Sequence, residues 1–142
     1  MLHNAAESLS ECAPSTLQAA YFEQLRAVIE TAGVEQVTAE SGLAAERIDT
    51  LAAGDEPTLT VEEAAAVLAV DDGNPDAEAI VFELRDHLLL GMTTAVLDVD
   101  TVAANAETDL TGQEIQQAIE GRTEMTLAQL AAIQAVIDGQ EN

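Results

Sequence analysis

The sequence contains no lysine and no tryptophan, and its four basic residues are all arginines, set against 27 aspartates and glutamates. The net charge of -23 leaves no basic patch, which excludes binding to anionic membranes or polyanions through such a patch. A single cysteine, Cys12, excludes an internal disulfide and a cysteine zinc site. Because only three residues are aromatic, the core has to be built from alanine, leucine, valine and isoleucine.

Long hydrophobic runs are also missing. The longest uncharged apolar run, from Leu88 to Leu97, is far shorter than the roughly 20 residues needed to cross a bilayer. The first fifteen residues contain neither a basic residue nor an apolar stretch, so no secretory signal is expected. The sequence therefore suggests a soluble, cytoplasmic protein.

The excess of acidic residues has two interpretations: a specific acidic role, such as nucleic-acid mimicry or cation buffering, or adaptation to molar cytoplasmic salt. The acidic residues are spread along the whole chain, lysine is absent and the apolar residues are small, which favours adaptation. At molar salt the Debye length falls to about 3 Å, so self-repulsion is screened. Leu, Ile, Val and Phe make up about a quarter of the chain, more than expected for a disordered one. We expect a folded, halophilic protein.

The apolar residues follow a helical period, and no segment alternates as a β-strand does, so we predict an all-α fold, a compact bundle of about eight helices. Capping boxes, in which Glu or Gln follows Ser or Thr by three residues, are predicted at Ser15, Thr60, Thr111 and Thr126. The predicted helices lie near 15–32, 34–41, 44–53, 60–69, 75–97, 99–106, 111–120 and 126–137.

Glycines and prolines mark the expected ends of these helices. Helices should stop at Gly33, Gly42, Gly54 and Gly121. At the sequence Asn74-Pro-Asp, the asparagine is expected to be an N-cap and the proline the first helical residue. A bend is considered where Gly91 interrupts the long helix 75–97.

These boundaries predict a domain organisation of three parts. Residues 1–14 form a loose N-terminal arm, residues 15–74 a first helical unit, and residues 75–142 a long central helix followed by a second helical unit. The turn-forming stretch at 71–75 is the best internal boundary.

Two stretches of the chain, 33–70 and 98–136, resemble one another. Both are predicted to form a helix, a short turn, a second helix, a loop and a capped helix. The matched pairs are Val34 and Val99, Val37 and Val102, Leu43 and Leu110, Ile48 and Ile115, Gly54 and Gly121, and Thr60 and Thr126. We favour an internal duplication with small insertions as the interpretation of the pattern; the alternative is a chance similarity in an alanine-rich helical chain.

The first stretch resembles the phage-repressor-type helix-turn-helix domain. The residues that carry the resemblance are Val37, Gly42, Leu43, Ile48, Gly54 and Pro57. Gly42 would take the left-handed turn between two helices, and Ile48 would hold the second helix on the first. The chain departs from the pattern at Thr38, where the family usually has alanine. In the second stretch Asp109 stands in place of the turn glycine and Glu124 near the place of the proline.

The chain as a whole is also similar to an uncharacterised haloarchaeal protein family, through the segments Asp98-Val-Asp100 and His87-Leu-Leu-Leu-Gly-Met92. This resemblance agrees with the halophilic interpretation of the composition. It implies no activity, cofactor or partner.

The helix-turn-helix resemblance implies that the second helix of a unit enters the DNA major groove. In the first unit this helix, 44–51, offers two carboxylates against one guanidinium, which is a poor approach to phosphates. In the second unit the corresponding helix offers polar groups, because glutamine can pair with adenine. The candidate DNA-reading residues are Gln113, Gln116, Gln117 and Arg122. The alternative is an ordinary polar helix surface, since glutamine is a good helix former.

Sites for chemistry are poorly supported. Glu83 and His87 lie four residues apart and share a helix face, but the sequence shows no further metal ligand, so a surface pair is favoured. Asp98 is expected to cap a helix. No glycine-rich phosphate loop is present. We therefore expect no enzyme activity, no cofactor and no metal.

The leading hypothesis is a non-enzymatic helical interaction module that self-associates or binds a protein partner. The apolar run at Leu88, Leu89 and Leu90 is too continuous for one helix face to bury, which makes it the candidate contact surface. The alternative is a DNA-binding transcriptional regulator that uses the second helix-turn-helix-like unit.

Overall fold

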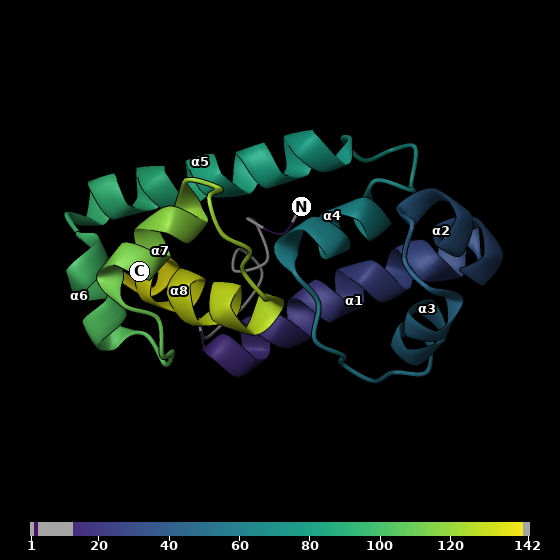
Figure 1. The fold of residues 1–142 in the computed structure, drawn as a ribbon, viewed down its shortest axis with the longest axis horizontal. Helices are drawn as coiled ribbons and strands as arrows, with labels where there is room; N and C mark the ends of the chain where they lie inside the picture. The colour runs from purple at the N-terminus through teal and green to yellow at the C-terminus, as the bar shows by residue number, and fades with distance from the viewer. Residues whose placement is uncertain (1, 3–12, 141–142) are drawn as a thin grey trace.

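The computed structural model describes Leu2 and residues 13–140 (Figure 1). Within these residues the chain forms eight helices and no strand, which confirms the expected all-α bundle. The helices are α1 (Pro14–Ala32), α2 (Val34–Ser41), α3 (Ala45–Ala52), α4 (Val61–Leu68), α5 (Ala77–Ala95), α6 (Val99–Asn105), α7 (Gly112–Ile119) and α8 (Leu127–Gln140).

Three of the four predicted capping boxes are confirmed. The hydroxyls of Thr60, Thr111 and Thr126 accept hydrogen bonds of 3.1, 3.2 and 3.1 Å from the backbone amides three residues later. The Glu or Gln side chain at that later position accepts a bond from the threonine's own amide, at 3.0 Å in each case. These bonds satisfy amides that the first turn of a helix leaves unpaired, and they fix the starts of α4, α7 and α8.

Two other predicted helix caps, at Ser15 and Asn74, are wrong. The helix α1 begins at Pro14, and no side chain caps it, because proline at the first position already fixes the helical φ. The N-cap of α5 is Asp76 rather than Asn74: its carboxylate accepts a 2.8 Å bond from the amide of Ala79. The Asn74 amide is used elsewhere, donating a 2.9 Å bond to the carbonyl of Leu68 at the end of α4.

Helix ends follow the glycines as expected. Gly33, Gly42, Gly54 and Gly121 all have positive φ, which side chains other than glycine rarely adopt. The predicted helix cap at Asp98 is also confirmed, with a 2.8 Å bond from the amide of Thr101 that lowers the pKa of the carboxyl group.

Helix α5 does not break at Gly91. It runs without interruption from Ala77 to Ala95, and Gly91 is buried along it. The helix ends at Val96, whose φ of 57° and ψ of 49° lie in the left-handed region. This conformation costs a β-branched residue roughly 1–2 kcal/mol, and Val96 is the one described residue other than glycine that adopts it.

The eight helices form two groups of four with the same order: one long helix followed by three shorter ones. The long helices α1 and α5 each have 19 residues, so the central helix expected between two units is matched by a first helix of equal length. Their buried positions correspond at a constant offset of 63 residues: Leu17 with Ile80, Tyr21 with Leu84, Leu25 with Leu88, Val28 with Gly91, and Ile29 with Met92.

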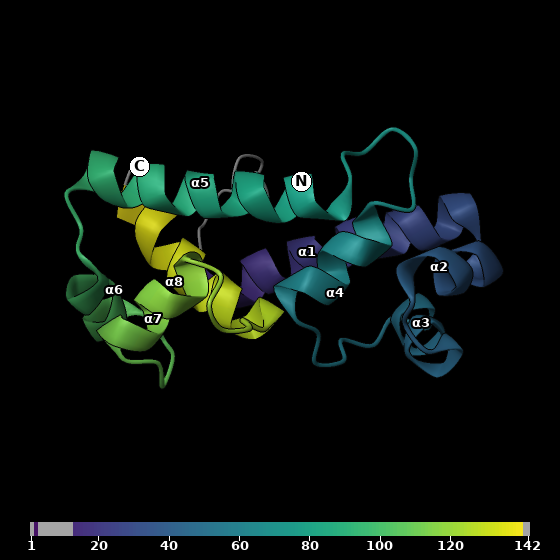
Figure 2. The same ribbon diagram turned by 45° about the horizontal axis from the view of Figure 1, so that its top comes forward.

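The two groups meet through equivalent positions. Thr60 and Thr126, the N-caps of α4 and α8, form an isolated antiparallel bridge. Around it, the amide of Val61 donates to Met125 at 2.8 Å and the amide of Leu127 donates to Leu59 at 2.9 Å. The packing is reciprocal as well, because α1 lies on α8 while α4 lies on α5 (Figures 1 and 2). One continuous hydrophobic core therefore runs through both groups.

The expected N-terminal arm, residues 1–14, lies mostly outside the described residues. Of its described members, Leu2 is fully buried in the core and Pro14 belongs to α1.

One polar contact on the surface of the first group leads to a prediction about pH. The guanidinium of Arg47 pairs with the carboxylate of Glu63 and also donates a 2.8 Å bond to the carbonyl of Thr58. The hydrogen bond from Arg47 is the main reason that the pKa of Glu63 is lowered, and the Thr60 amide adds to it. Glu63 therefore stabilises the fold in its charged form.

We expect Glu63→Gln to lower the free energy of unfolding near pH 7 by about 1 kcal/mol. The folded pKa lies below the ordinary value, so the contribution is complete above that value and disappears as pH falls through the folded pKa. The measurement is urea denaturation in molar KCl at several pH values. Glu62→Gln, at an exposed neighbour without such bonds among the described residues, should change little. A pH-independent difference between the Glu63→Gln variant and the original chain would contradict this assignment.

Candidate functional site

The predicted DNA-reading residues lie on and just after α7. Gln113 and Gln116 are exposed, whereas Gln117 is half-buried. Gln116 donates a 3.0 Å bond to the carboxylate of Glu120, and the same carboxylate lies 3.2 Å from Nε of Arg122. Two of the four candidate residues are thus engaged by an acidic side chain on the surface that would have to approach phosphates.

The remaining arginines are also used within the fold. Arg26 donates 3.0 Å bonds to the carbonyls of Leu51 and Asp55, at the end of α3. Arg47 pairs with Glu63. The guanidinium of Arg85 lies so close to Gly121 that a Cβ there would be 2.5 Å from its Cζ. The positive charges at the ends of α3 and α7 suit the helix dipole, and they are not gathered into a surface for a nucleic acid.

A buried polar network joins α1, α5 and α8. The hydroxyl of Tyr21 donates to the side-chain oxygen of Gln134, whose amide donates a 2.9 Å bond to the carboxylate of Asp138. The ring of His87 lies 2.9 Å from the same carboxylate. His87 is therefore directed at Asp138 and is not paired with Glu83 as the sequence suggested. Among residues 2 and 13–140, no group of three His, Cys, Asp or Glu side chains is arranged to hold a metal ion.

The predicted protein-contact run at Leu88–Leu90 is partly wrong. Leu88 is completely buried, because it occupies the core-facing position of α5 that corresponds to Leu25 in α1. Leu89 and Leu90 are 51% and 64% exposed, as expected for a contact surface. Two further apolar side chains on the same helix were missed: Phe82 is 69% exposed and Val96 is 90% exposed.

These exposed residues form a stripe along the outer face of α5, which lies at the edge of the molecule (Figure 2). Phe82, Leu89 and Val96 are spaced by seven residues, the spacing at which side chains line up for packing against a second helix. Leu90 lies beside Leu89 at the margin. We call Phe82, Leu89, Leu90 and Val96 the α5 stripe. The seven-residue spacing of Phe82, Leu89 and Val96 could have revealed the α5 stripe in the sequence. The three consecutive leucines at 88–90 drew attention away from this spacing.

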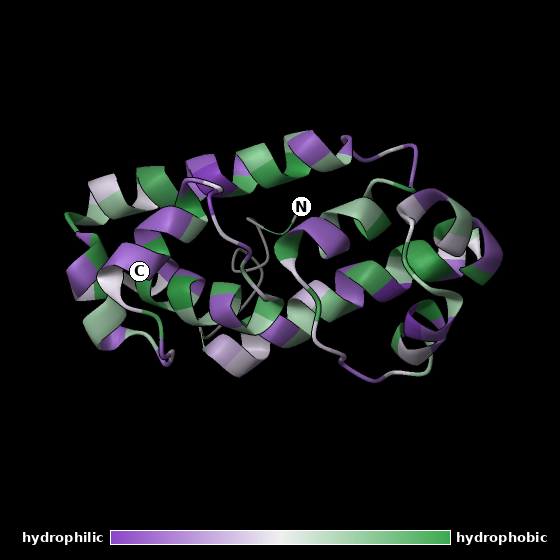
Figure 3. Cartoon of the chain, in the orientation of Figure 1, coloured by the Kyte–Doolittle hydropathy of each residue, from purple (hydrophilic) through white to green (hydrophobic). Residues whose placement is uncertain are grey.

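Charge is distributed unevenly along the α5 stripe. The exposed carboxylates of α5, those of Glu78, Glu83 and Asp86, all lie in its N-terminal half. From residue 87 to residue 97 the sequence has no carboxylate, and Figure 3 shows this half in green to white. In a chain with a net charge of -23, this half of α5 therefore exposes Leu89 and Leu90 without a carboxylate on the helix beside them.

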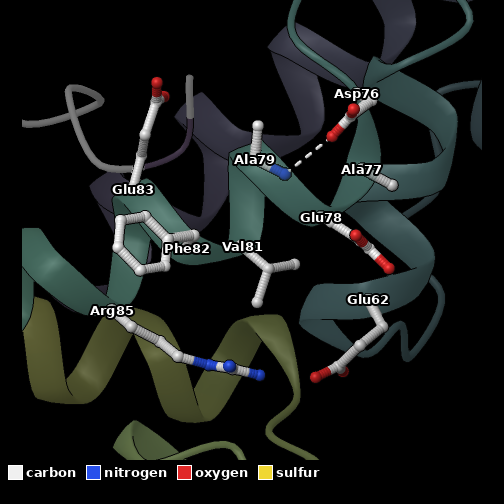
Figure 4. A pocket seen from close by; sticks show the side chains of 9 residues that line it. All are labelled: Glu62, Asp76, Ala77, Glu78, Ala79, Val81, Phe82, Glu83 and Arg85. Atoms are coloured by element: carbon white, nitrogen blue, oxygen red, sulfur yellow. Dashed lines mark hydrogen bonds between the residues drawn. The ribbon is translucent and has the colours of Figure 1, made fainter.

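Beside the charged half of the stripe lies an open groove of about 950 Å³ between α5 and the start of α4. Figure 4 shows the ring of Phe82 over the outer side of α5, with Glu62, Glu78 and Arg85 on the groove side and Glu83 directed away. The groove is lined by Glu62, Asp76, Ala77, Glu78, Ala79, Val81, Phe82, Glu83 and Arg85. We call it the α4–α5 groove; its lining is apolar at the centre and carries four carboxylates against one guanidinium.

Within the described residues, no single helix has both the length and the apolar character needed to cross a membrane. Taken together, α5 and α6 meet the requirement of length and composition, but the chain turns by 93° between them.

Comparison with known proteins adds one finding. No curated protein and no solved structure matches the chain. A family model described as a family of unknown function, DUF5791, matches residues 17–140, from the first turn of α1 to the end of α8. The match covers both groups of four helices, with the α5 stripe and the α4–α5 groove inside it. The chain is therefore a member of the DUF5791 family.

Proposed function

We propose that this chain is a non-enzymatic interaction module of a halophilic cytoplasm, and that it self-associates through the α5 stripe. The observation that carries the proposal is the exposure of Phe82, Leu89, Leu90 and Val96 along one face of a helix at the edge of the fold. A row of exposed apolar side chains on one helix face is a candidate contact site in a protein that otherwise presents polar surfaces.

The distribution of charge on α5 favours a second copy of this chain as the partner that covers the α5 stripe. Two molecules of net charge -23 repel one another over most of their surfaces, and they approach at lowest cost where carboxylates are missing. An antiparallel pairing of two α5 helices sets the charged half of each, with Glu83 and Asp86, against the uncharged half of the other. A parallel pairing would bring Asp86 against Asp86. An antiparallel pair related by a twofold axis is also a closed dimer, which explains why the association would stop at two.

The helix-turn-helix resemblance bears on how the helices around α5 are arranged. Helices α2 and α3 are joined at Gly42, which is left-handed with a φ of 77°, and Ile48 is fully buried where the resemblance requires it. Together with the matching order of helices in α1–α4 and α5–α8, this favours an internal duplication of a helix-turn-helix-like unit. In the second unit Asp109 does not take positive φ, so the turn before α7 differs. We infer that the frame serves as a scaffold for contact through α5.

Self-association is tested by sedimentation equilibrium in molar KCl, where the original chain is expected to be a dimer. Leu89→Glu puts a carboxylate at the centre of the α5 stripe and is expected to raise the dissociation constant at least about tenfold. Ala45→Glu adds the same charge at an exposed position of α3 and should leave the constant unchanged. An original chain that remains monomeric at every concentration would overturn the proposal.

A second candidate function is a DNA-binding regulator that uses α7, favoured by the exposure of Gln113 and Gln116 near the start of that helix. The test is recovery of crosslinked chromatin with tagged protein from cells at native salt. Discrete enriched sites that disappear in a Gln113→Ala/Gln116→Ala variant would establish DNA binding through α7. Since Glu120 occupies the same surface, we expect no enrichment.

A further inference from the structure

Val96 is an unusual residue for the end of a helix. At the corresponding end of α1 the chain has Gly33, with a φ of 90°, whereas α5 ends with a β-branched side chain in left-handed conformation. Val96 is also 90% exposed, so the strain of its backbone is not offset by burial within the molecule. Backbone strain of this kind is concentrated at sites of function. Within the chain, the amides of Leu97 and Val96 donate bonds of 2.8 and 3.2 Å to the carbonyls of Met92 and Thr93 and hold this turn. They leave the side chain of Val96 exposed to another molecule.

The α4–α5 groove is also much larger than the pocket at the corresponding place in the other half of the described residues. The corresponding place between α8 and α1 is bounded by Gln18, Phe22 and Ala128, the counterparts of Val81, Arg85 and Glu62. There the space is only about 50 Å³, because Phe22 and the loop 56–59 fill it. The half that begins with α5 therefore differs from the half that begins with α1 in two features, the left-handed Val96 and the large groove.

The position of Val96 along α5 and around its axis is related to that of the groove residues by helical spacing. Val96 follows Phe82 by fourteen residues, about 21 Å along the helix, and it follows Glu78 by eighteen residues, about five full turns. Val96 therefore lies on the same line along α5 as a residue of the groove. Both Phe82 and Val96 are seven residues from Leu89, so a twofold axis beside Leu89 places Phe82 of one copy opposite Val96 of the other.

We propose that, in the dimer of the preceding section, Val96 of each copy inserts into the α4–α5 groove of the other, beside Phe82. The inference rests on self-association through the α5 stripe and specifies its register and its receptor site. The central lining of the groove, Ala77, Val81 and Phe82, suits a valine side chain. The carboxylates on the groove side, those of Glu62 and Glu78, outnumber the guanidinium of Arg85, so the groove also favours a positive over a negative group.

This charge asymmetry provides the test. Val96→Asp and Val96→Lys both replace an exposed side chain, and the fold of each is checked by circular dichroism. In molar KCl, Val96→Asp is expected to raise the dissociation constant at least about tenfold, because its carboxylate enters a groove lined by carboxylates. Val96→Lys is expected to stay within about threefold of the original chain. Val96→Asn, a neutral residue that tolerates left-handed geometry, controls for the backbone and should weaken the dimer less than Val96→Asp.

A crosslinking experiment fixes the register independently. In a Cys12→Ser background, single-cysteine variants Phe82→Cys and Val96→Cys are mixed in molar KCl and oxidised, with the expectation that the mixed disulfide dimer dominates. Equal weakening by Val96→Asp and Val96→Lys, or preferential crosslinking of Val96→Cys to itself, would overturn the groove assignment although the dimer stands. A monomeric original chain would overturn both the groove assignment and self-association.

Discussion

Transfer from molar KCl to dilute buffer is expected to unfold this protein, with loss of most of its helical circular dichroism signal. The chain carries 27 acidic residues and four arginines, and folding brings these charges close together. Between about 1 M and about 0.01 M salt the Debye length grows from about 3 Å to about 30 Å. In dilute buffer each carboxylate is therefore repelled by charges across the whole molecule, and the compact state is destabilised.

The structure explains why internal ion pairs do not relieve this repulsion. Among the described residues, two arginines form ion pairs, Arg47 with Glu63 and Arg122 with Glu120, and His87 lies 2.9 Å from the carboxylate of Asp138. Arg26 is bound to backbone carbonyls, so it leaves the carboxylates uncompensated. Exposed pairs such as that of Arg122 contribute little in any case. Because the arginines compensate so few carboxylates, the repulsion among the others has to be screened by ions of the solvent.

A control separates charge screening from a general effect of salt on apolar burial. In dilute buffer, lowering the pH toward the isoelectric point of about 4.1 protonates carboxylates and should restore helical signal if self-repulsion is the cause. The opposing loss of the Glu63 contribution is small. Helical signal that is unchanged on desalting would contradict the prediction, and signal that is lost on desalting but not recovered by acid would assign the effect to apolar burial.

The sequence predicted the helices well because their ends are determined locally. The capping boxes at Thr60, Thr111 and Thr126 and the positive-φ glycines each depend on a few neighbouring residues. Prediction failed where a longer contact decided the outcome. Asn74 was expected to cap α5, but its side chain reaches back to the carbonyl of Leu68 and leaves the capping role to Asp76.

The candidate site was predicted less well, because residues that are adjacent in sequence are not adjacent on the surface of a helix. Three consecutive leucines look like one patch, yet on a helix they point about 100° apart, and Leu88 points into the core. The α5 stripe instead joins Phe82, Leu89 and Val96, which are distant in sequence. The groove depends on α4 and α5 together, so only the fold brings Glu62 and Phe82 to the lining of one groove. The contact between half-buried His87 and buried Asp138 likewise joins residues 51 positions apart.

Leu88→Ala is expected to lower the free energy of unfolding by about 2–5 kcal/mol, the usual range for a leucine truncated in a close-packed core. Leu88 is fully buried on α5, where the helix faces α8 and α4, and a cavity would remain because the neighbouring helices are held from both halves of the fold. Leu25→Ala, at the corresponding position of α1, should cost a similar amount. The measurement is urea denaturation in molar KCl, followed by circular dichroism.

Leu90→Ala is the matched control, since it removes the same atoms from a side chain that is 64% exposed on the same helix. Its cost to the folded single chain should be below about 1 kcal/mol. Because denaturation of a dimer also reports association, the comparison is made at concentrations below the dissociation constant, where the single chain unfolds alone. Two adjacent leucine positions are then expected to separate two properties, with Leu88 contributing to the stability of the fold and Leu89 to the proposed association of folded chains. Equal destabilisation by Leu88→Ala and Leu90→Ala would show that α5 is rotated about its axis relative to the structure, and the α5 stripe would then be part of the core.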